Sequence, residues 1–279
     1  MPELPEAETV RRGLQAEIVG RRIDRVEVTG LRSVRRHPDP AELHRRLRGS
    51  PVRGVGRVGK FLTLSAGAEV VVVHLGMSGQ LLLAGAEAPR PRHSHVVVVF
   101  GDGSELRFVD PRTFGQVFLS AGTDVAGRSR PVELSHLGFD PLEDAMSATR
   151  FGGLVRARRV MLKALLMDQR FVAGVGNIYS DEILHAAGLR FDRRASSLSE
   201  ESAVGLHGHL MRILRASVRL GGSSLSDMQY RDVHGRPGRY QDRHLVFARE
   251  ALPCAGCGTP IVRQAWGGRS TFFCPNCQK

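Results

Sequence analysis

The chain has little cysteine, no long apolar run and almost no lysine. All four cysteines fall within the last 26 of its 279 residues. A chain of this length buries around three quarters of its unfolded surface and does not need disulfides to fold. Apolar stretches such as Val70–Val73 and Val96–Phe100 fall far short of the roughly 20 residues that a membrane-spanning helix requires. The sequence therefore excludes membrane-spanning helices.

The N-terminal segment has no apolar core either. Glu3, Glu6 and Glu8 occupy positions where a signal peptide would carry a basic and then an apolar region. We therefore expect a cytoplasmic protein. At about 150 residues per domain, the length suggests two domains.

The charge balance is strongly basic. Forty Lys plus Arg against 28 Asp plus Glu gives a net charge of +12, and Lys60, Lys163 and Lys279 are the only lysines. The planar guanidinium of arginine suits phosphate better than the point charge of lysine. This excess indicates a polyanionic partner and favours nucleic acid. A generic solubilising charge in an arginine-rich proteome is the alternative.

The first third of the sequence is typical of a β-sandwich that follows one helix. Pro5–Val19 has apolar residues at helical spacing, and Asp39-Pro40 is expected to begin a short helix that runs to Arg48. Gly101-Asp102-Gly103 is typical of a hairpin. Many short strands at this spacing favour two packed sheets. The expected strands are Ile23–Val28, Val52–Val58, Phe61–Leu64, Val70–Leu75, Gln80–Leu83, Val96–Phe100, Leu106–Val109 and Gln116–Leu119.

The pattern changes to helices after about residue 121. Ala121–Pro131 is glycine-rich and is a candidate linker, and Ser223–Arg243 is expected to be a long loop. Ser197 and Glu200 have the spacing of a capping box, and Gly221-Gly222 is expected to end the last helix. The expected helices are Leu142–Thr149, Gly153–Met167, Asn177–Ala187 and Ser199–Leu220.

The cysteines form two pairs, Cys254-x2-Cys257 and Cys274-x2-Cys277, separated by 16 residues. This spacing predicts a zinc ribbon, because each pair places two sulfurs on one ion and the intervening hairpin joins the pairs. Disulfides or unrelated thiols are the alternatives. Four thiolates leave no open position for water, so the zinc is expected to be structural. Arg269 is expected at the hairpin tip, either solvated or holding a phosphate.

Pro2 directly follows the initiator methionine. Removal of Met1 would expose a secondary amine with a pKa near 8, which can attack an electrophilic carbon and form an iminium. Glu3 and Glu6 are close enough in sequence to handle protons. A proline at the start of a helix is more commonly a structural residue, and composition alone leaves both interpretations open.

The combination of motifs resembles bacterial formamidopyrimidine-DNA glycosylases over nearly the whole chain. The resemblance implies an α+β fold with an N-terminal β-sandwich catalytic domain (1–120), a linker (121–140), a helix–two-turn–helix domain with a lesion loop (141–243) and a four-cysteine zinc ribbon (244–279). DNA would lie in the cleft between the domains. Beside the cysteines, the motifs are Met1–Leu14 (MPELPEAETVRRGL), Gly59–Phe61, His74–Gly79, Asp110–Gly115 and Gly174–Tyr179.

The resemblance also implies a catalytic role for five residues. Pro2 would be the nucleophile that attacks C1′ of the damaged nucleotide, and Glu3 would be the acid, with Glu6 supporting it. Lys60 would contact phosphate and assist β-elimination. Arg269 would hold the phosphate beside the lesion and take part in δ-elimination.

Reaching C1′ requires the nucleotide to leave the base stack. By the same resemblance, Met77 and Phe114 would fill the void, and Arg112 would bond the orphaned partner base. The loop after Gly222 would fold over the everted base, but it differs from family members that carry a basic residue near Ser226, which leaves the lesion preference open. Further expected DNA contacts are His74, His93, Arg159, Lys163 and Asn177. Glu182 is expected either as a buried cap or as a solvated helix residue.

We therefore expect a bifunctional glycosylase and abasic-site lyase for oxidised purines. It would act as a monomer on double-stranded DNA that contains oxidised bases or abasic sites, and would associate with the nucleoid. The nearest alternative is an endonuclease VIII-like enzyme for oxidised pyrimidines; Leu4 favours the first, because the sister group usually has glycine there. An inactive damage sensor and a zinc-ribbon RNA-binding protein are the alternatives from other classes.

Overall fold

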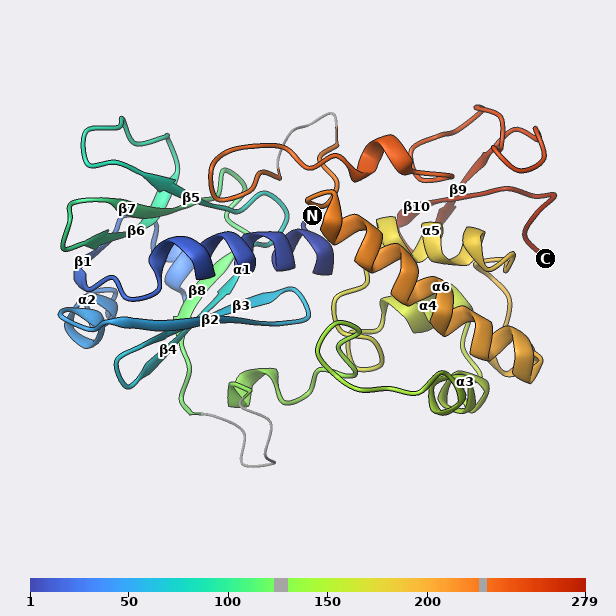
Figure 1. The fold of residues 1–279 in the computed structure, drawn as a ribbon, viewed down its shortest axis with the longest axis horizontal. Coiled ribbons are helices and arrows are strands. Elements are labelled where there is room, and N and C mark those ends of the chain that lie inside the picture. The colour runs from blue at the N-terminus through green and yellow to red at the C-terminus, as the bar shows by residue number, and fades with distance from the viewer. Residues whose placement is uncertain (123–129, 226–229) are drawn as a thin grey trace. The chain divides into compact units, whose positions relative to one another are not determined.

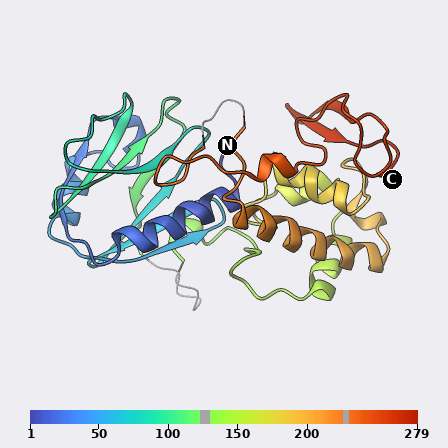
Figure 2. The ribbon, with the colours of Figure 1, turned by 45° about the horizontal axis from the view of Figure 1, so that its top comes forward.

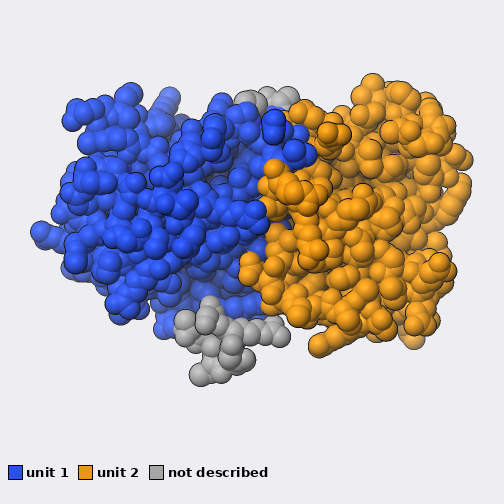
Figure 3. Space-filling model, viewed as in Figure 1, with its two compact units in different colours: residues 1–136, 220–239 blue, residues 137–219, 240–279 orange. Residues whose placement is uncertain are grey.

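The computed structural model describes residues 1–122, 130–225 and 230–279. These residues form two compact units, shown in different colours in Figure 3. The first unit comprises residues 1–136 and 220–239, and the second comprises residues 137–219 and 240–279. The segment that follows the last long helix thus returns to the first unit. In the described part of the chain, no helix is both long and apolar enough to cross a membrane.

The first unit is a β-sandwich with a leading helix, as predicted. Helix α1 (Leu4–Ile18) buries Leu4, Val10 and Leu14 at helical spacing and packs against β2 and β3 (Figure 1). A 3₁₀ turn η1 (Leu31–Val34) and helix α2 (Ala41–Leu47) follow β1. The helix begins one residue after the predicted Asp39-Pro40 start: Pro40 is its N-cap residue, and the Asp39 carboxylate accepts a hydrogen bond from the Ala41 N–H at 3.0 Å.

Two four-stranded antiparallel sheets make up the sandwich, and all eight strands lie within two residues of their predicted ranges. Strands β6 (Ser94–Phe100) and β7 (Glu105–Val109) are joined by the predicted hairpin turn, where Gly103 has φ +82°. Side chains from both sheets fill the core, which holds Val26, Leu64, Val73 and Phe108. One sheet has the order β1 (Ile23–Val28), β6 (Ser94–Phe100), β7 (Glu105–Val109) and β5 (Gln80–Ala84). The other has the order β2 (Val52–Val58), β3 (Phe61–Ala66), β4 (Glu69–His74) and β8 (Gln116–Leu119). A short 3₁₀ turn, η2 (Val132–Leu134), follows the last strand, β8, in this unit.

The second unit is helical and ends in a β-hairpin. Helix α6 (Glu200–Arg219) packs against α3 (Ala148–Arg156) and α5 (Asn177–Ala186). Helix α5 also contacts strand β10 (Arg269–Phe273). In Figure 2, the red hairpin stands beside the yellow helix α5. Its elements are α3 (Ala148–Arg156), α4 (Leu162–Met167), α5 (Asn177–Ala186), η3 (Ala195–Ser197), α6 (Glu200–Arg219), η4 (Tyr240–Arg243), β9 (Val262–Trp266) and β10 (Arg269–Phe273).

The predicted helix 142–149 is wrong. Residues 141–144 form a turn and a bend, and residues 145–147 have no regular structure, because the side chains of Asp140 and Asp144 bond to nearby backbone N–H groups. Such local bonds compete with helix formation. Ser147 then caps α3 by accepting a hydrogen bond from the Arg150 N–H at 3.2 Å.

The predicted helix 153–167 and the predicted capping box are also wrong in part. The helix is interrupted between α3 and α4, where Met161 pairs with Arg194 across an isolated bridge. Long-range pairing thus outweighs the local helical pattern. At the start of α6, the Ser199 hydroxyl accepts a hydrogen bond from the Ser202 N–H, whereas Ser197 lies in η3. Gly221 and Gly222 have positive φ and end this helix as predicted.

Candidate active site and zinc centre

The start of α1 is held by a buried carboxylate. Glu3 is the N-cap residue and is 2% exposed, and its N–H donates to Glu6 Oε2 at 2.8 Å. The other oxygen of Glu6 accepts a hydrogen bond from the Ser223 N–H at 2.7 Å. Gly222 has φ +78°, and a Cβ there would lie 2.6 Å from Glu6 Oε1. Glu6 therefore fixes the backbone beside Pro2 and the first residues of the loop that follows α6.

A second buried carboxylate links α1 to the turn that carries Lys60. The fully buried Arg57 guanidinium donates to Glu8 Oε2 at 3.1 Å and to the Gly59 carbonyl at 3.0 Å. Burial by itself would raise the pKa of Glu8, but hydrogen bonds from Arg11 and Arg12 and the charge of Arg57 outweigh it and hold the pKa at about 2. Glu8 is therefore ionised, and it holds the β2–β3 turn through Arg57.

This arrangement predicts acid sensitivity of the first unit. The pKa of Glu8 is lower in the fold than its ordinary 4.5, so its stabilisation is complete above pH 4.5 and is lost as the pH falls towards 2. The shift corresponds to roughly 3 kcal/mol. We expect Tm to fall across this window. Glu8→Gln should have a lower Tm at pH 7, and its Tm should change less with pH below pH 4.5. Calorimetry against pH checks this. Glu17→Gln is the control, because it replaces a carboxylate on the same helix whose side chain is 39% exposed. A Glu8→Gln profile as steep as that of the unmodified protein would contradict the assignment.

His74 ends β4 as a neutral hydrogen-bond donor. Burial lowers its pKa to about 4, and the positive charges of Lys60 and Arg35 act in the same direction. Its Nδ1 accepts a hydrogen bond from the Gly76 N–H at 3.2 Å, and its ring centroid lies 4.6 Å from that of Phe61. Because Nδ1 is the acceptor, Nε2 carries the hydrogen of the neutral ring. His74 can therefore donate to an anion without a charge of its own.

The structure brings Met77, Arg112 and Phe114 onto two packed turns. Met77 is 36% exposed and Phe114 is 46% exposed, and the exposed Arg112 has its guanidinium carbon 5.4 Å from the Phe114 ring centroid. Gly76 has φ +64°, and a Cβ there would lie 2.5 Å from the backbone nitrogen of Gly115. The turns therefore approach as closely as glycine permits. Exposed apolar side chains next to a guanidinium suit insertion into a base stack.

Asp110 organises these two turns, and sequence reasoning gave it no role. Its fully buried carboxylate accepts hydrogen bonds from the Ser78 hydroxyl at 2.6 Å and from the Gly115 N–H at 2.7 Å. Ser78 Oγ in turn accepts the Arg112 N–H at 3.2 Å. The Asp110 N–H donates to the carbonyl of His93, whose φ is +70°. Asp110 therefore also contacts His93, which is one of the expected DNA contacts.

In the second unit, Asn177 connects the start of α5 to the β9–β10 hairpin. Its Nδ2 donates to the Ser270 carbonyl at 2.9 Å, next to the exposed Arg269. Gly267 and Gly268 both have positive φ, as a two-residue type I′ turn requires. The sequence-predicted residues Asn177 and Arg269 are therefore neighbours, and the sequence-predicted Arg159 is exposed on the connection between α3 and α4.

The expected phosphate contact by Lys163 is wrong. Its side chain is fully buried, and Nζ lies 2.6 Å from Asp181 Oδ1. The same carboxylate accepts hydrogen bonds from the Thr271 hydroxyl at 2.7 Å and the Phe272 N–H at 3.0 Å. Lys163 and Asp181 therefore hold β10, and Asp181 is a residue that sequence reasoning missed.

Glu182 is a buried cap, and the solvated alternative is wrong. It is fully buried, and its oxygens accept the N–H groups of Leu245, Val246 and Phe247 at 2.9–3.0 Å. Helix α5 thereby holds the chain that leads into the segment with the four cysteines, residues 254–277, which we call the cysteine module.

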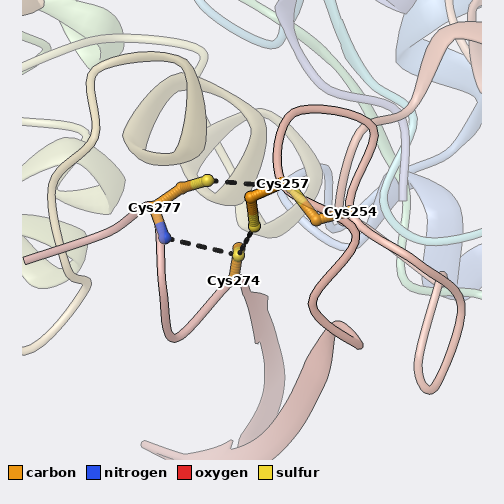
Figure 4. A group of neighbouring side chains, drawn as sticks. All are labelled: Cys254, Cys257, Cys274 and Cys277. Carbon is orange, nitrogen blue, oxygen red and sulfur yellow. Dashed lines mark hydrogen bonds between the residues drawn. The ribbon is translucent and has the colours of Figure 1, made fainter.

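The four cysteines converge as the spacing predicted. Figure 4 shows their sulfurs gathered between the loop before β9 and the segment after β10. All four Sγ atoms lie within 4.8 Å of one another, with 3.5 Å between Cys257 and Cys274 and 3.9 Å between Cys254 and Cys277. A Zn–S distance of about 2.3 Å in a tetrahedron gives S···S separations of about 3.8 Å. The residues fit one structural zinc ion held by four thiolates.

Three family models match most of the chain. Residues 1–117 match the formamidopyrimidine-DNA glycosylase N-terminal domain, residues 137–229 match its H2TH domain, and residues 251–279 match the zinc finger found in FPG and IleRS. These matches confirm the predicted helix–two-turn–helix domain and zinc ribbon.

Full-length relatives agree with the family models. The chain is 46% identical to formamidopyrimidine-DNA glycosylase of Salinispora arenicola, over all of this chain and 96% of that protein. Lactococcus lactis Fpg bound to abasic-site DNA is 32% identical, with a TM-score of 0.88 over 99% of each chain. The same enzyme bound to DNA that contains N7-benzyl-Fapy-dG is 34% identical over the whole of both chains, with a TM-score of 0.88. The chain belongs to the formamidopyrimidine-DNA glycosylase family.

Proposed function

We propose that the protein is a DNA glycosylase and abasic-site lyase that removes oxidised purines, 8-oxoguanine and formamidopyrimidines, from double-stranded DNA. The observation that carries the proposal is the whole-length relationship to enzymes bound to abasic-site and Fapy-dG DNA, in a chain that retains Pro2, Glu3 and the exposed Met77–Arg112–Phe114 cluster. We further propose that it acts as a monomer in the cytoplasm, on the DNA of the nucleoid.

In the proposed chemistry, the Pro2 nitrogen attacks C1′ of the damaged nucleotide after Met1 has been removed. Glu3 protonates the sugar or the departing base, and the base leaves with the electrons of its glycosidic bond. The adduct then opens its sugar ring: the C1′–O4′ bond breaks, its electron pair goes to O4′, which takes a proton, and the nitrogen lone pair forms an iminium with C1′. This iminium acidifies the neighbouring C2′ hydrogen, so that elimination breaks the strand on the 3′ side. Lys60 assists this β-elimination, and Arg269 holds the phosphate for the second, δ-elimination. Glu6 keeps Glu3 in place through the backbone bond described above.

The cluster on the two packed turns would stabilise the everted state. Met77 and Phe114 fill the space that the nucleotide leaves, and Arg112 bonds the unpaired partner base, which offsets part of the few kcal/mol of unstacking. The proposed backbone contacts are His74, His93, Arg159, Asn177 and Arg269. His74 donates through Nε2 as a neutral ring, so its contact is expected to persist unchanged between pH 6 and pH 8.

The proposal is tested with duplexes that carry one lesion each. We expect release of 8-oxoguanine opposite cytosine, cleavage of the strand and a covalent adduct with an abasic-site oligonucleotide on borohydride reduction. An undamaged duplex of the same sequence is the control. A preference for thymine glycol would overturn the choice of purines in favour of the endonuclease VIII-like alternative. Binding without any adduct would instead indicate a damage sensor, and tighter binding to RNA would indicate an RNA-binding protein.

A further inference from the structure

One face of α5 carries polar residues that all contact the C-terminal cysteine module. Asn177, Asp181 and His185 are four residues apart, so they lie along one side of the helix. Asn177 and Asp181 bind β10, as described above. His185, one turn further, places Nε2 at 3.5 Å from Sγ of Cys254. The last polar residue on this face therefore contacts a predicted zinc ligand directly.

The chemistry of the two groups fixes the direction of this contact. A zinc-bound thiolate has lone pairs and no hydrogen, so it can only accept a hydrogen bond. The other ring nitrogen of His185, Nδ1, is buried without a hydrogen-bond partner among the described residues. A bare Nε2 would point its lone pair at a negatively charged sulfur, which is unfavourable. The tautomer with hydrogen on Nε2 avoids this repulsion and satisfies the donor.

We propose that His185 is an outer-sphere residue of the zinc site, with its Nε2–H donating a hydrogen bond to the Cys254 thiolate. Four thiolates around one Zn²⁺ give a site with a net charge of −2, and a donor to one sulfur draws off part of that charge. The sulfur thereby becomes a weaker nucleophile towards alkylating agents and oxidants. His185 thus slows zinc loss through Cys254. The inference depends on the zinc assignment and not on the proposed enzymatic function.

The hydrogen bond can be detected directly in the full chain loaded with ¹¹³Cd in place of zinc. We expect scalar coupling between the cadmium nucleus and the Hε2 hydrogen of His185, transmitted across N–H···S. A His185 ring whose Hε2 shows no coupling to the metal would overturn the proposal. This measurement needs no substitution, so it is decisive even if variants fail to fold.

The effect on the metal is measured with two variants. His185→Phe keeps a ring but removes the donor, whereas His185→Gln keeps an N–H donor. We expect zinc release in the presence of a thiol-alkylating reagent to be about tenfold faster for His185→Phe, and close to the unmodified rate for His185→Gln. In Co²⁺-loaded protein, the thiolate-to-cobalt charge-transfer band of His185→Phe should move to lower energy.

The matched control is His209→Phe, which replaces a histidine on α6 that contacts Arg212. It should release zinc at the unmodified rate. Equal rates for His185→Phe and the unmodified protein would overturn the proposal. Equally fast release from the Phe and Gln variants would also overturn it, because the effect would then come from side-chain shape and not from the donor.

Discussion

Blocking the amine of Pro2 is expected to abolish base release and strand cleavage while leaving DNA binding in place. A residual N-terminal extension converts the Pro2 nitrogen into an amide, which cannot attack C1′. Pro2→Gly leaves a primary amine without the ring, and we expect it to weaken borohydride trapping strongly. Loss of a covalent nucleophile lowers rates by about 10³-fold or more. Single-turnover cleavage of an 8-oxoguanine duplex and trapping on abasic-site DNA measure both effects.

The controls separate chemistry from folding. The same extension placed after Lys279 leaves the Pro2 amine free and should preserve activity. Binding to a duplex with an uncleavable abasic analogue should persist in Pro2→Gly, because the hydrogen bonds of Glu6 to the Glu3 and Ser223 backbone do not involve the proline ring. Mass spectrometry of the intact chain establishes whether Met1 is removed. Cleavage at the unmodified rate by a chain with a blocked terminus would contradict the proposed mechanism.

The sandwich could be predicted from the sequence because its signals are local. Strands such as Phe61–Ala66 alternate in burial and end at a glycine turn, so the strand periodicity specifies them without knowledge of their partners. The cysteine spacing specifies the metal site in the same way. The predicted helix 142–149 was wrong because Asp140 and Asp144 bond to backbone groups within four residues, an alternative that an apolar pattern does not reveal.

The residues that support the site could not be predicted, because their partners lie far away in the sequence. Asp181 binds Thr271 and Phe272, about 90 residues later, and this partnership turns Lys163 from an expected phosphate contact into a buried structural cation. Asp110 accepts a hydrogen bond from Ser78, which lies 32 residues earlier in the His74–Gly79 motif. The sequence difference near Ser226, on which the lesion preference depends, lies outside the described residues.

The second large effect is expected from Cys257→Ser, which should lose zinc and much of the DNA affinity together. The β9–β10 hairpin has only two strands, and β9 is almost entirely exposed. Such a hairpin is marginal by itself in water. Its local core is small and includes Cys254 and Cys274 themselves. The metal therefore supplies most of the energy that closes this module, since structural zinc sites bind with about 10 kcal/mol or more.

Arg269→Ala is the matched variant, because it removes the proposed phosphate contact but keeps all four sulfurs. We expect Arg269→Ala to retain one zinc ion per chain and to bind an abasic-analogue duplex less tightly, with a weaker salt dependence. Cys257→Ser should show the same loss of affinity together with loss of zinc, because an unclosed hairpin no longer presents Arg269 next to Asn177. Metal analysis and fluorescence anisotropy at two salt concentrations distinguish the cases. Tight DNA binding by zinc-free Cys257→Ser would show that the hairpin holds its position without the metal, and would contradict the structural role assigned to it.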